Sequence, residues 1–422
     1  MAPAPGSPPG IVPASVIVVS RNRPEALARC LAGLMQQDHP ELEIVAVTDA
    51  PGRAAVARSG TGQWIKLVPF DGDNIAAARN MGLVAAAGQV VAFIDDDAVP
   101  EPSWLRRLTA PIGAGDAPAA GGFVRGRNGI SFQWRAAQVD RTGRAGALAS
   151  DPARTILHSP PPDRAIKTEG TNMAFERAQL LRMGGFDHAF RFFLDETDLN
   201  MRLSAAGALT AIVPRAEVHH GFAASARRRG DRAPRDLFDI GASSMAFLRK
   251  HAPEDRHAAA LERLRSTERR RALTHMVSGA LEPRDVRRLM RSLEEGIIEG
   301  ARRRIGETPP LADEARPFLA MPLAGPRPGR VMAGWPWQRR QLHRAARAAV
   351  RRGAVVTVFC FGPTTLFHRM RFHPAGFWEQ SGGLFGRAER DGPLLRAAGM
   401  GTRLAEEMRR IAPLRPVDSM VS

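Results

Sequence analysis

The sequence predicts an α/β fold in which a Rossmann-like sheet is flanked by helices. Between residues 15 and 97, short apolar runs alternate with amphipathic segments, and each apolar run ends in polar residues. Such β-α-β alternation is typical of doubly wound parallel sheets. Because the crossovers are right-handed, the carboxyl ends of the strands should share one edge, where ligands bind in these folds.

Strands and helices alternate regularly in the first hundred residues. The four strands are expected at 15–20, 42–50, 64–70 and 89–97, and the two helices at 23–37 and 74–88. The first helix has Pro24 at an early position, which suits helix starts, and Gly88 is expected to end the second. Further along, residues 168–207 read as a strand, a helix, the turn at Gly184 and Gly185, and a second helix.

Composition shifts divide the chain into five parts. Arginine density rises after about residue 225, and proline density after about residue 308. We expect a flexible tail, the sheet domain, an arginine-rich loop with a helical extension, a Pro-rich linker, and a small α/β segment of open role. Their ranges are 1–12, 13–225, 226–308, 309–330 and 331–422.

Bulk charge and cysteine content limit the partners and the compartment. The chain has 60 Lys and Arg against 43 Asp and Glu, a formal net charge of +17 that favours anionic partners. Its two cysteines, Cys30 and Cys360, allow neither a disulfide framework nor a cysteine zinc site, so we expect a reducing cytoplasm. The N-terminus lacks a signal-peptide pattern, and the apolar runs are too short to span a bilayer.

The stretch QVVAFIDDDAVP, residues 89–100, aims a buried strand at three adjacent carboxylates. Asp95 and Asp97 would lie on one face, roughly 6.5 to 7 Å apart. At an effective dielectric near 20 they repel by roughly 2 to 3 kcal/mol. Such a cluster persists if it is well solvated or if a cation sits in it, and from this stretch alone both readings stay open.

Two other polar clusters accompany these acids: Asp195 to Asp198, reading DETD, and the pair His219 and His220. Together the three clusters resemble family-2 glycosyltransferases of the GT-A fold. Five motifs carry the resemblance in family order: SVIVVSRNRPEALARCL, ARNMGLVAAAGQVVAFIDDDAVP, GTNMAFERAQLLRMGGFD, FLDETDLNMRLSAAG and AEVHHG. It covers residues 14 to about 250.

The resemblance implies a metal-dependent inverting transfer of a hexosyl or deoxyhexosyl group from a nucleotide diphosphate sugar. Carboxylates would hold a hard divalent cation, Mn²⁺ or Mg²⁺, against the diphosphate. Asp97 and the late histidine would bind that metal. Counting along the strand from Ala216 and Val218 favours His220 over His219.

The resemblance also assigns a nucleotide pocket. Asp49, at the end of the second strand, would read the base, and Ser20 and Arg21 would line its pocket. Arg79 would contact base or phosphate. Asp95 would lie near the ribose. Asp96 could share either the ribose contact of Asp95 or the metal binding of Asp97.

A base must take the acceptor proton. The family commonly reads Glu-Asp-x-Asp here, whereas this chain reads Asp-Glu-Thr-Asp, with the first two acids exchanged. Glu196 is therefore the first choice and Asp195 the second, while acids that merely cap a helix are the structural alternative. Asp198 would orient the helix start or bind an arginine. Asn172, Asp198 and Arg227 are candidate contacts to the diphosphate or the acceptor.

Two other functions would also suit parts of this sequence. A nucleotidyltransferase normally shows a Gly-rich basic loop after its first strand, which SRNRPEA lacks, and neither GxGxxG after that strand nor GxxxxGK[ST] occurs. A non-catalytic arginine-rich module that binds nucleic acid or membrane does not need the acids and the histidine, so no specific nucleic acid is expected. By family analogy, UDP is the expected carrier, with dTDP or GDP as alternatives. A glycan or lipid-linked saccharide of polysaccharide biosynthesis is the expected acceptor, reached in the cytoplasm or at the inner face of the membrane.

Overall fold

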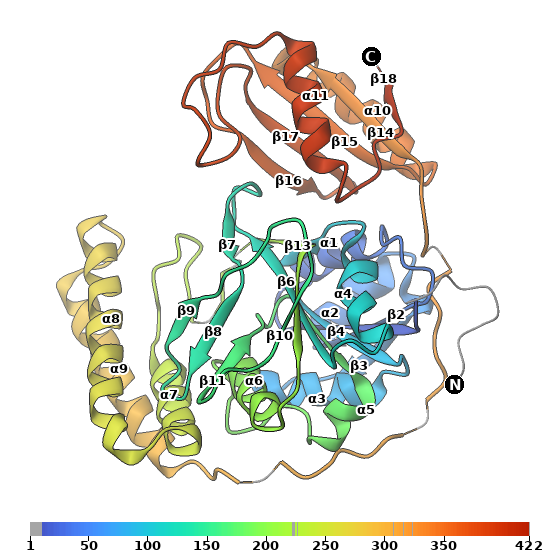
Figure 1. Cartoon of the computed structure of the whole chain (residues 1–422). Helices are drawn as coiled ribbons and strands as arrows, with labels where there is room; N and C mark the ends of the chain where they lie inside the picture. Colours follow the sequence, from blue (N-terminus) through green and yellow to red (C-terminus); the bar gives the residue numbers. More distant parts are fainter. Residues whose placement is uncertain are drawn as a thin grey trace.

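The computed structural model describes residues 11–221, 224–225, 227–306, 308–314, 316–322 and 324–421. The greater part of the predicted tail, residues 1–10, lies outside this range. Figure 1 shows a large body around one twisted sheet, a helical layer at one side and a smaller sheet at the C-terminal end. The α/β fold class is therefore confirmed, including the helical extension and the small terminal α/β segment. The domain boundaries drawn from the sequence remain predictions.

The main sheet begins with the four predicted strands. They are β1 (Ala14–Ser20), β2 (Leu42–Thr48), β3 (Ile65–Pro69) and β4 (Val90–Asp95), in spatial order β3-β2-β1-β4 and all parallel. The connecting helices are α1 (Pro24–Leu34), α2 (Ala50–Arg58) and α3 (Ile75–Ala85). Helix α3 ends at Ala85 rather than at Gly88. Gly88 instead permits a close approach, because a Cβ there would lie 2.6 Å from the Ser15 nitrogen.

Beyond β4 the sheet is mixed, whereas the alternation predicted a parallel one. The further members are β5 (Ala98–Pro100), β6 (Ala119–Arg125), β7 (Phe132–Trp134), β10 (Ile156–His158), β12 (Met173–Glu176) and β13 (Thr210–His220). Strand β12 runs antiparallel between β4 and β6. The chain between β6 and β12 makes a separate small sheet instead of a crossover helix, so β12 enters in the opposite direction. That small sheet is β8 (Ala137–Asp140), β9 (Ala145–Ala147) and β11 (Arg164–Lys167).

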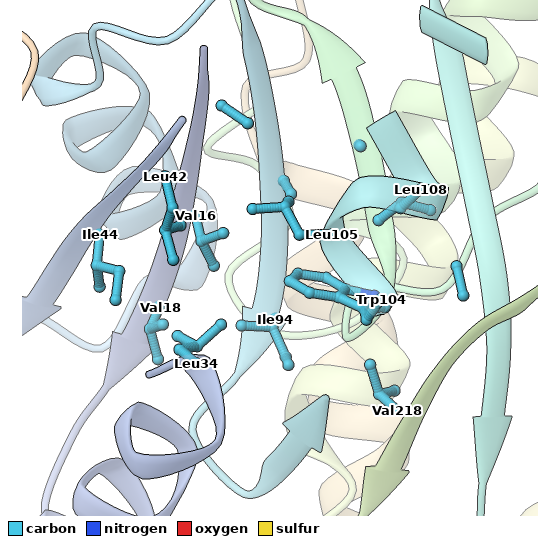
Figure 2. Close-up of a cluster of buried hydrophobic side chains, with 14 of the residues drawn as sticks. Val16, Val18, Leu34, Leu42, Ile44, Ile94, Trp104, Leu105, Leu108 and Val218 are labelled. Carbon is cyan, nitrogen blue, oxygen red and sulfur yellow. The ribbon is translucent and has the colours of Figure 1, made fainter. Parts of the chain in front are cut away.

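Alternating side chains of the strands bury against helices on both faces of the main sheet. Val16 and Val18 pack in one core with α1 and with α4 (Trp104–Gly113), whose Trp104 lies at the centre of Figure 2. Ile17, between them, faces the other core, with α3, α5 (Arg177–Arg182) and α6 (Asp195–Ala205). Both faces of β1 are thus covered, which explains its nearly continuous apolar sequence.

The rest of the chain adds a helical layer and a second sheet. Helices α7 (Phe238–His251), α8 (His257–Val277) and α9 (Pro283–Arg302) pack on one another. The second sheet has the order β16-β17-β15-β14-β18. Its elements are β14 (Gly329–Gly334), α10 (Arg339–Arg351), β15 (Val355–Gly362), β16 (Arg369–His373), β17 (Phe377–Gly383), α11 (Met400–Ile411) and β18 (Ser419–Val421). Among the described residues, no helix is long and apolar enough to cross a bilayer.

The segment predicted as a Pro-rich linker lies along the main domain, as the long trace at the bottom and right of Figure 1 shows. The Leu311 nitrogen donates to the Leu181 carbonyl at 3.0 Å, and the Leu319 nitrogen donates to the Glu43 carboxylate at 2.8 Å. Met321 is buried in the main core. Its described residues therefore form a strap that belongs to the domain it crosses.

Met321→Ala should lower the free energy of unfolding by about 2 to 5 kcal/mol, because it removes a buried side chain from a packed core. Urea unfolding followed by circular dichroism measures this. Arg316→Ala, in the same segment but exposed and paired with the exposed Glu314, should change it by less than about 0.5 kcal/mol. Equal effects of the two substitutions would contradict the strap.

Candidate functional site

The carboxyl ends of β1, β4 and β13 meet at one edge of the main sheet. Strand β5 turns back from the acidic cluster and pairs antiparallel with β13, so that Ala98 lies opposite His220. The Gly221 nitrogen donates to the Asp97 carbonyl at 2.8 Å, which closes the turn. His220 Nε2 then lies 3.2 Å from an Asp97 carboxylate oxygen. Pairing of two short strand ends thus joins residues 123 positions apart in the chain.

Asp95, Asp97 and His220 form a group that could hold a metal ion. One ligand atom from each lies within 4.8 Å of the other two. Two carboxylate oxygens and one imidazole nitrogen suit Mn²⁺, and the carboxylates also suit Mg²⁺. Asp95 joins this group, although the resemblance implied a ribose contact for it. His219 points elsewhere, and its Nε2 lies 2.7 Å from Glu101.

Cations from the chain itself also face the acidic cluster. Arg23 lies 2.6 Å from Asp96 and 3.5 Å from Asp97, and Arg79 lies 3.4 Å from Asp95. Burial raises the pKa of Asp96 to about 7, while Arg23 acts to lower it and Asp97 to raise it. Sequence reasoning missed Arg23, although it stands in the loop directly after the first strand. The repulsion between the carboxylates is therefore partly offset before any ligand binds.

Helix α6 brings the DETD acids to the same edge. Leu194, just before it, has a φ of 65°, a left-handed conformation that is uncommon for leucine and sets the direction of the helix start. Asp195 forms a buried ion pair with Arg79, which also bonds the Gly170 carbonyl at 3.1 Å. Burial raises the pKa of Asp195 to about 7, although Arg79 opposes the rise. Arg79 thereby links Asp95 to Asp195.

Glu196 is more accessible than its neighbour. Its side chain is 16% exposed, against 3% for Asp195. Lys167, at the end of β11, lies 3.5 Å from Glu196 and 2.8 Å from Glu169. Burial acts to raise the pKa of Glu196, but Lys167 and Arg79 outweigh it and the pKa is lowered. Lys167 and Glu169 were missed as site residues, because nothing in the sequence marks their approach to α6.

The residues expected to bind the nucleotide lie near the ends of β1 and β2. The Asp49 carboxylate caps α2 by accepting a hydrogen bond from the Gly52 nitrogen at 3.1 Å. It also accepts a hydrogen bond from the Asn22 nitrogen at 2.6 Å. The Ser20 hydroxyl donates to Asp96 at 2.7 Å, and Arg21 is exposed. Asp49 and Ser20 therefore already have structural partners, and Arg21 is the accessible side chain among them.

The three remaining predicted residues have internal partners. The Asn172 amide, fully buried, donates to the Phe123 and Ala216 carbonyls at 2.9 and 2.8 Å and accepts from the Trp104 indole at 2.8 Å. Asp198 contacts Arg202, Lys250 and His251, at 2.9, 2.8 and 2.8 Å, and one of these is an arginine as expected. Arg227 pairs with Asp239 at 2.5 Å. These contacts give Asn172 and Asp198 structural roles in this conformation.

The first part of the chain is similar in sequence to known glycosyltransferases. Residues 15–178 match the model of the glycosyl transferase family 2. The chain is similar to the O-antigen biosynthesis protein RfbC of Myxococcus xanthus, with 27% identity over 52% of this chain and 18% of the relative. It is also similar to a pre-mycofactocin glycosyltransferase of Mycobacterium tuberculosis, with 26% identity over 52% of this chain and 44% of the relative. The chain thus spans less than half the length of either relative.

Solved structures of glycosyltransferases also resemble this one distantly. One is the mannosyltransferase PcManGT of Pyrobaculum calidifontis in complex with GDP-Man and Mn²⁺, with 18% identity, a TM-score of 0.40 and coverage of 68% of this chain and 87% of that one. Another is GalNAc-T7 with UDP, GalNAc and Mn²⁺, with 17% identity, a TM-score of 0.41 and coverage of 50% and 44%.

Arg79→Met should lower the free energy of unfolding by about 3 to 5 kcal/mol, because it leaves the buried Asp195 without its cation. Chemical denaturation measures the loss. The double substitution Arg79→Met with Asp195→Asn should recover part of it, since the uncompensated charge is gone. Additive losses in this double-mutant cycle would contradict the proposed coupling.

Proposed function

Because residues 15–178 belong to glycosyl transferase family 2, we propose that this protein transfers a sugar from a nucleotide diphosphate sugar to an acceptor hydroxyl, with inversion at the sugar carbon. One observation carries the proposal. Two carboxylates and an imidazole that could bind a metal lie at the same sheet edge as the acidic start of α6, and Arg79 contacts both groups. On this proposal a donor site and a proton acceptor would be adjacent.

Asp95, Asp97 and His220 would hold the divalent cation. Bound there, Mn²⁺ or Mg²⁺ supplies positive charge against the diphosphate that departs. Arg23, 3.5 Å from Asp97, would compete with the metal for that carboxylate. Its guanidinium, 27% exposed, would then be available to the phosphates, which it can bind through two hydrogen bonds.

Glu196 is the base that this arrangement favours. Asp195 is committed to Arg79 and nearly inaccessible, whereas Glu196 is partly exposed and its lowered pKa keeps it ionised at neutral pH. The acceptor oxygen forms the new bond to the sugar carbon, the bond from that carbon to the diphosphate oxygen breaks, and the acceptor proton passes to Glu196. The nucleoside diphosphate leaves with the bonding electrons.

The donor and acceptor are proposed at the level of class. UDP is the first choice of carrier, with Arg21, Asp49 and Ser20 around its base. The acceptor is proposed to be a glycan or lipid-linked saccharide of a surface polysaccharide, which the name of the Myxococcus relative, an O-antigen biosynthesis protein, supports by analogy. Such an acceptor would be met in the cytoplasm or at the inner face of a membrane.

UDP with Mn²⁺ should raise the melting temperature, and UDP without metal should not. At a ligand concentration 100 times Kd the stabilisation is about 2.7 kcal/mol. A thermal-shift titration measures it, with dTDP and GDP in parallel. Asp97→Ala should abolish the shift. The control Asp116→Ala, which changes an exposed residue after α4, should retain it. A shift that is equal without metal would contradict metal dependence.

The pH profile of sugar transfer distinguishes the two candidate bases. With Glu196 as base, kcat/KM should stay flat between about pH 5 and 7, because its pKa is lowered from its ordinary value near 4.5. With Asp195 as base, kcat/KM should fall as pH drops through about 7, because protonation removes the base. Transfer assays over this range decide between them, and Glu196→Gln should be inactive only if Glu196 is the base.

A further inference from the structure

Strands β5 and β13 carry different chemistry on their two faces. Asp97 precedes β5 and His220 ends β13, and together they face the candidate metal site. His219, which precedes His220, points to the other face of β13, and there its Nε2 lies 2.7 Å from Glu101, the residue that follows β5. The contact between Glu101 and His219 therefore joins β5 and β13 on the face opposite the candidate metal site.

The C-terminal segment contacts Glu101 of this Glu101–His219 pair. Arg415, four residues after α11, donates from Nε to one Glu101 oxygen at 2.9 Å and from a terminal nitrogen to the other. Arg415 and Glu101 are 3% and 1% exposed. An ion pair so deeply buried is costly to break, because each partner would remain as an uncompensated charge. Residues 314 positions apart in the chain are thereby locked together.

Apolar packing closes the same junction. Trp378 of β17, fully buried, has the Arg415 guanidinium 3.9 Å from its ring centroid and the His219 ring at 4.8 Å. Val99, in the middle of β5, belongs to one hydrophobic cluster with Trp378 and Phe359 of the second sheet. Figure 1 shows the second sheet above the end of the main sheet where β7 and β13 lie. The C-terminal segment thus covers the face of the β5–β13 pair that lies opposite the candidate metal site.

We propose that the C-terminal segment holds His220 in place for metal binding, acting through the face of β5 and β13 opposite the metal site. Arg415 is the positioning residue in this segment. Arg415 holds Glu101, Glu101 holds His219, and the backbone shared by His219 and His220 sets where the His220 imidazole stands relative to Asp97. Partners of this outer kind commonly change metal affinity without touching the ion. The inference rests on the proposed function, since it presumes that Asp95, Asp97 and His220 bind a divalent cation. It gives residues 331–422 a role that the family match does not reach.

The test measures binding of Mn²⁺ alone to the full chain, from the electron paramagnetic resonance signal of the free ion. Arg415→Met should weaken Mn²⁺ binding roughly tenfold. Arg415→Lys keeps a charge for Glu101 but cannot span both of its oxygens, so its affinity should lie between those of Arg415→Met and the unaltered chain. Unfolding transitions are recorded for each variant. If Arg415→Met does not fold, the lysine variant carries the test with an expected severalfold loss.

Arg410→Met is the matched control. Arg410 bonds Glu407 of α11 and Gln380 of β17, at 2.8 Å each, so its loss damages the same segment without removing a hydrogen bond to Glu101 or His219. It should lower the melting temperature and leave Mn²⁺ affinity unchanged. Unchanged affinity in both Arg415 variants, or an equal loss in Arg410→Met, would overturn the positioning role. Absence of Mn²⁺ binding by the unaltered chain would overturn the metal site itself and this inference with it.

Discussion

Charge compensation at the end of β4 is the constraint on which the site depends. Three consecutive carboxylates meet partners from three distant segments: Asp95 faces the Arg79 guanidinium of α3, Asp96 faces the Arg23 guanidinium before α1, and Asp97 faces the His220 imidazole of β13. The Asp96 and Asp97 side chains are 0% and 5% exposed, and carboxylates buried to this degree are tolerated only when they are paired and hydrogen-bonded. The cluster is therefore stable only when α1, α3 and β13 are all in place around β4.

The same compensation prepares the site for chemistry. Partners supplied by side chains can be exchanged for ligands, provided that the total charge stays balanced. The Arg23 side chain is 27% exposed, whereas Arg79 is 5% exposed and buried against Asp195. We expect Arg23 to move on donor binding and Arg79 to stay. On the proposed function, the rigid side of the site would carry the proton acceptor and the adaptable side the donor.

Much of this arrangement could be predicted from the sequence, because it follows from local pattern. The alternation of strands and helices predicted the ends of β1 to β4 to within two residues, and counting along the strand favoured His220, which lies with Asp95 and Asp97, over His219. Arg23 and Lys167 could not be identified this way, since their partners lie 73 and 29 residues away and only the folded chain brings them together. The antiparallel β12 and the docking of Arg415 on Glu101 also depend on tertiary contacts that no short motif encodes.

The central claim is that distant segments of this chain hold one divalent cation through carboxylates and a single imidazole. Electron spin-echo modulation of bound, saturating Mn²⁺ tests it most directly, because it detects nitrogen coordinated to the ion. The account predicts a coupling from one histidine nitrogen that persists in His219→Gln and vanishes in His220→Gln. Bound Mn²⁺ without any nitrogen coupling, or with a coupling that survives His220→Gln, would contradict it.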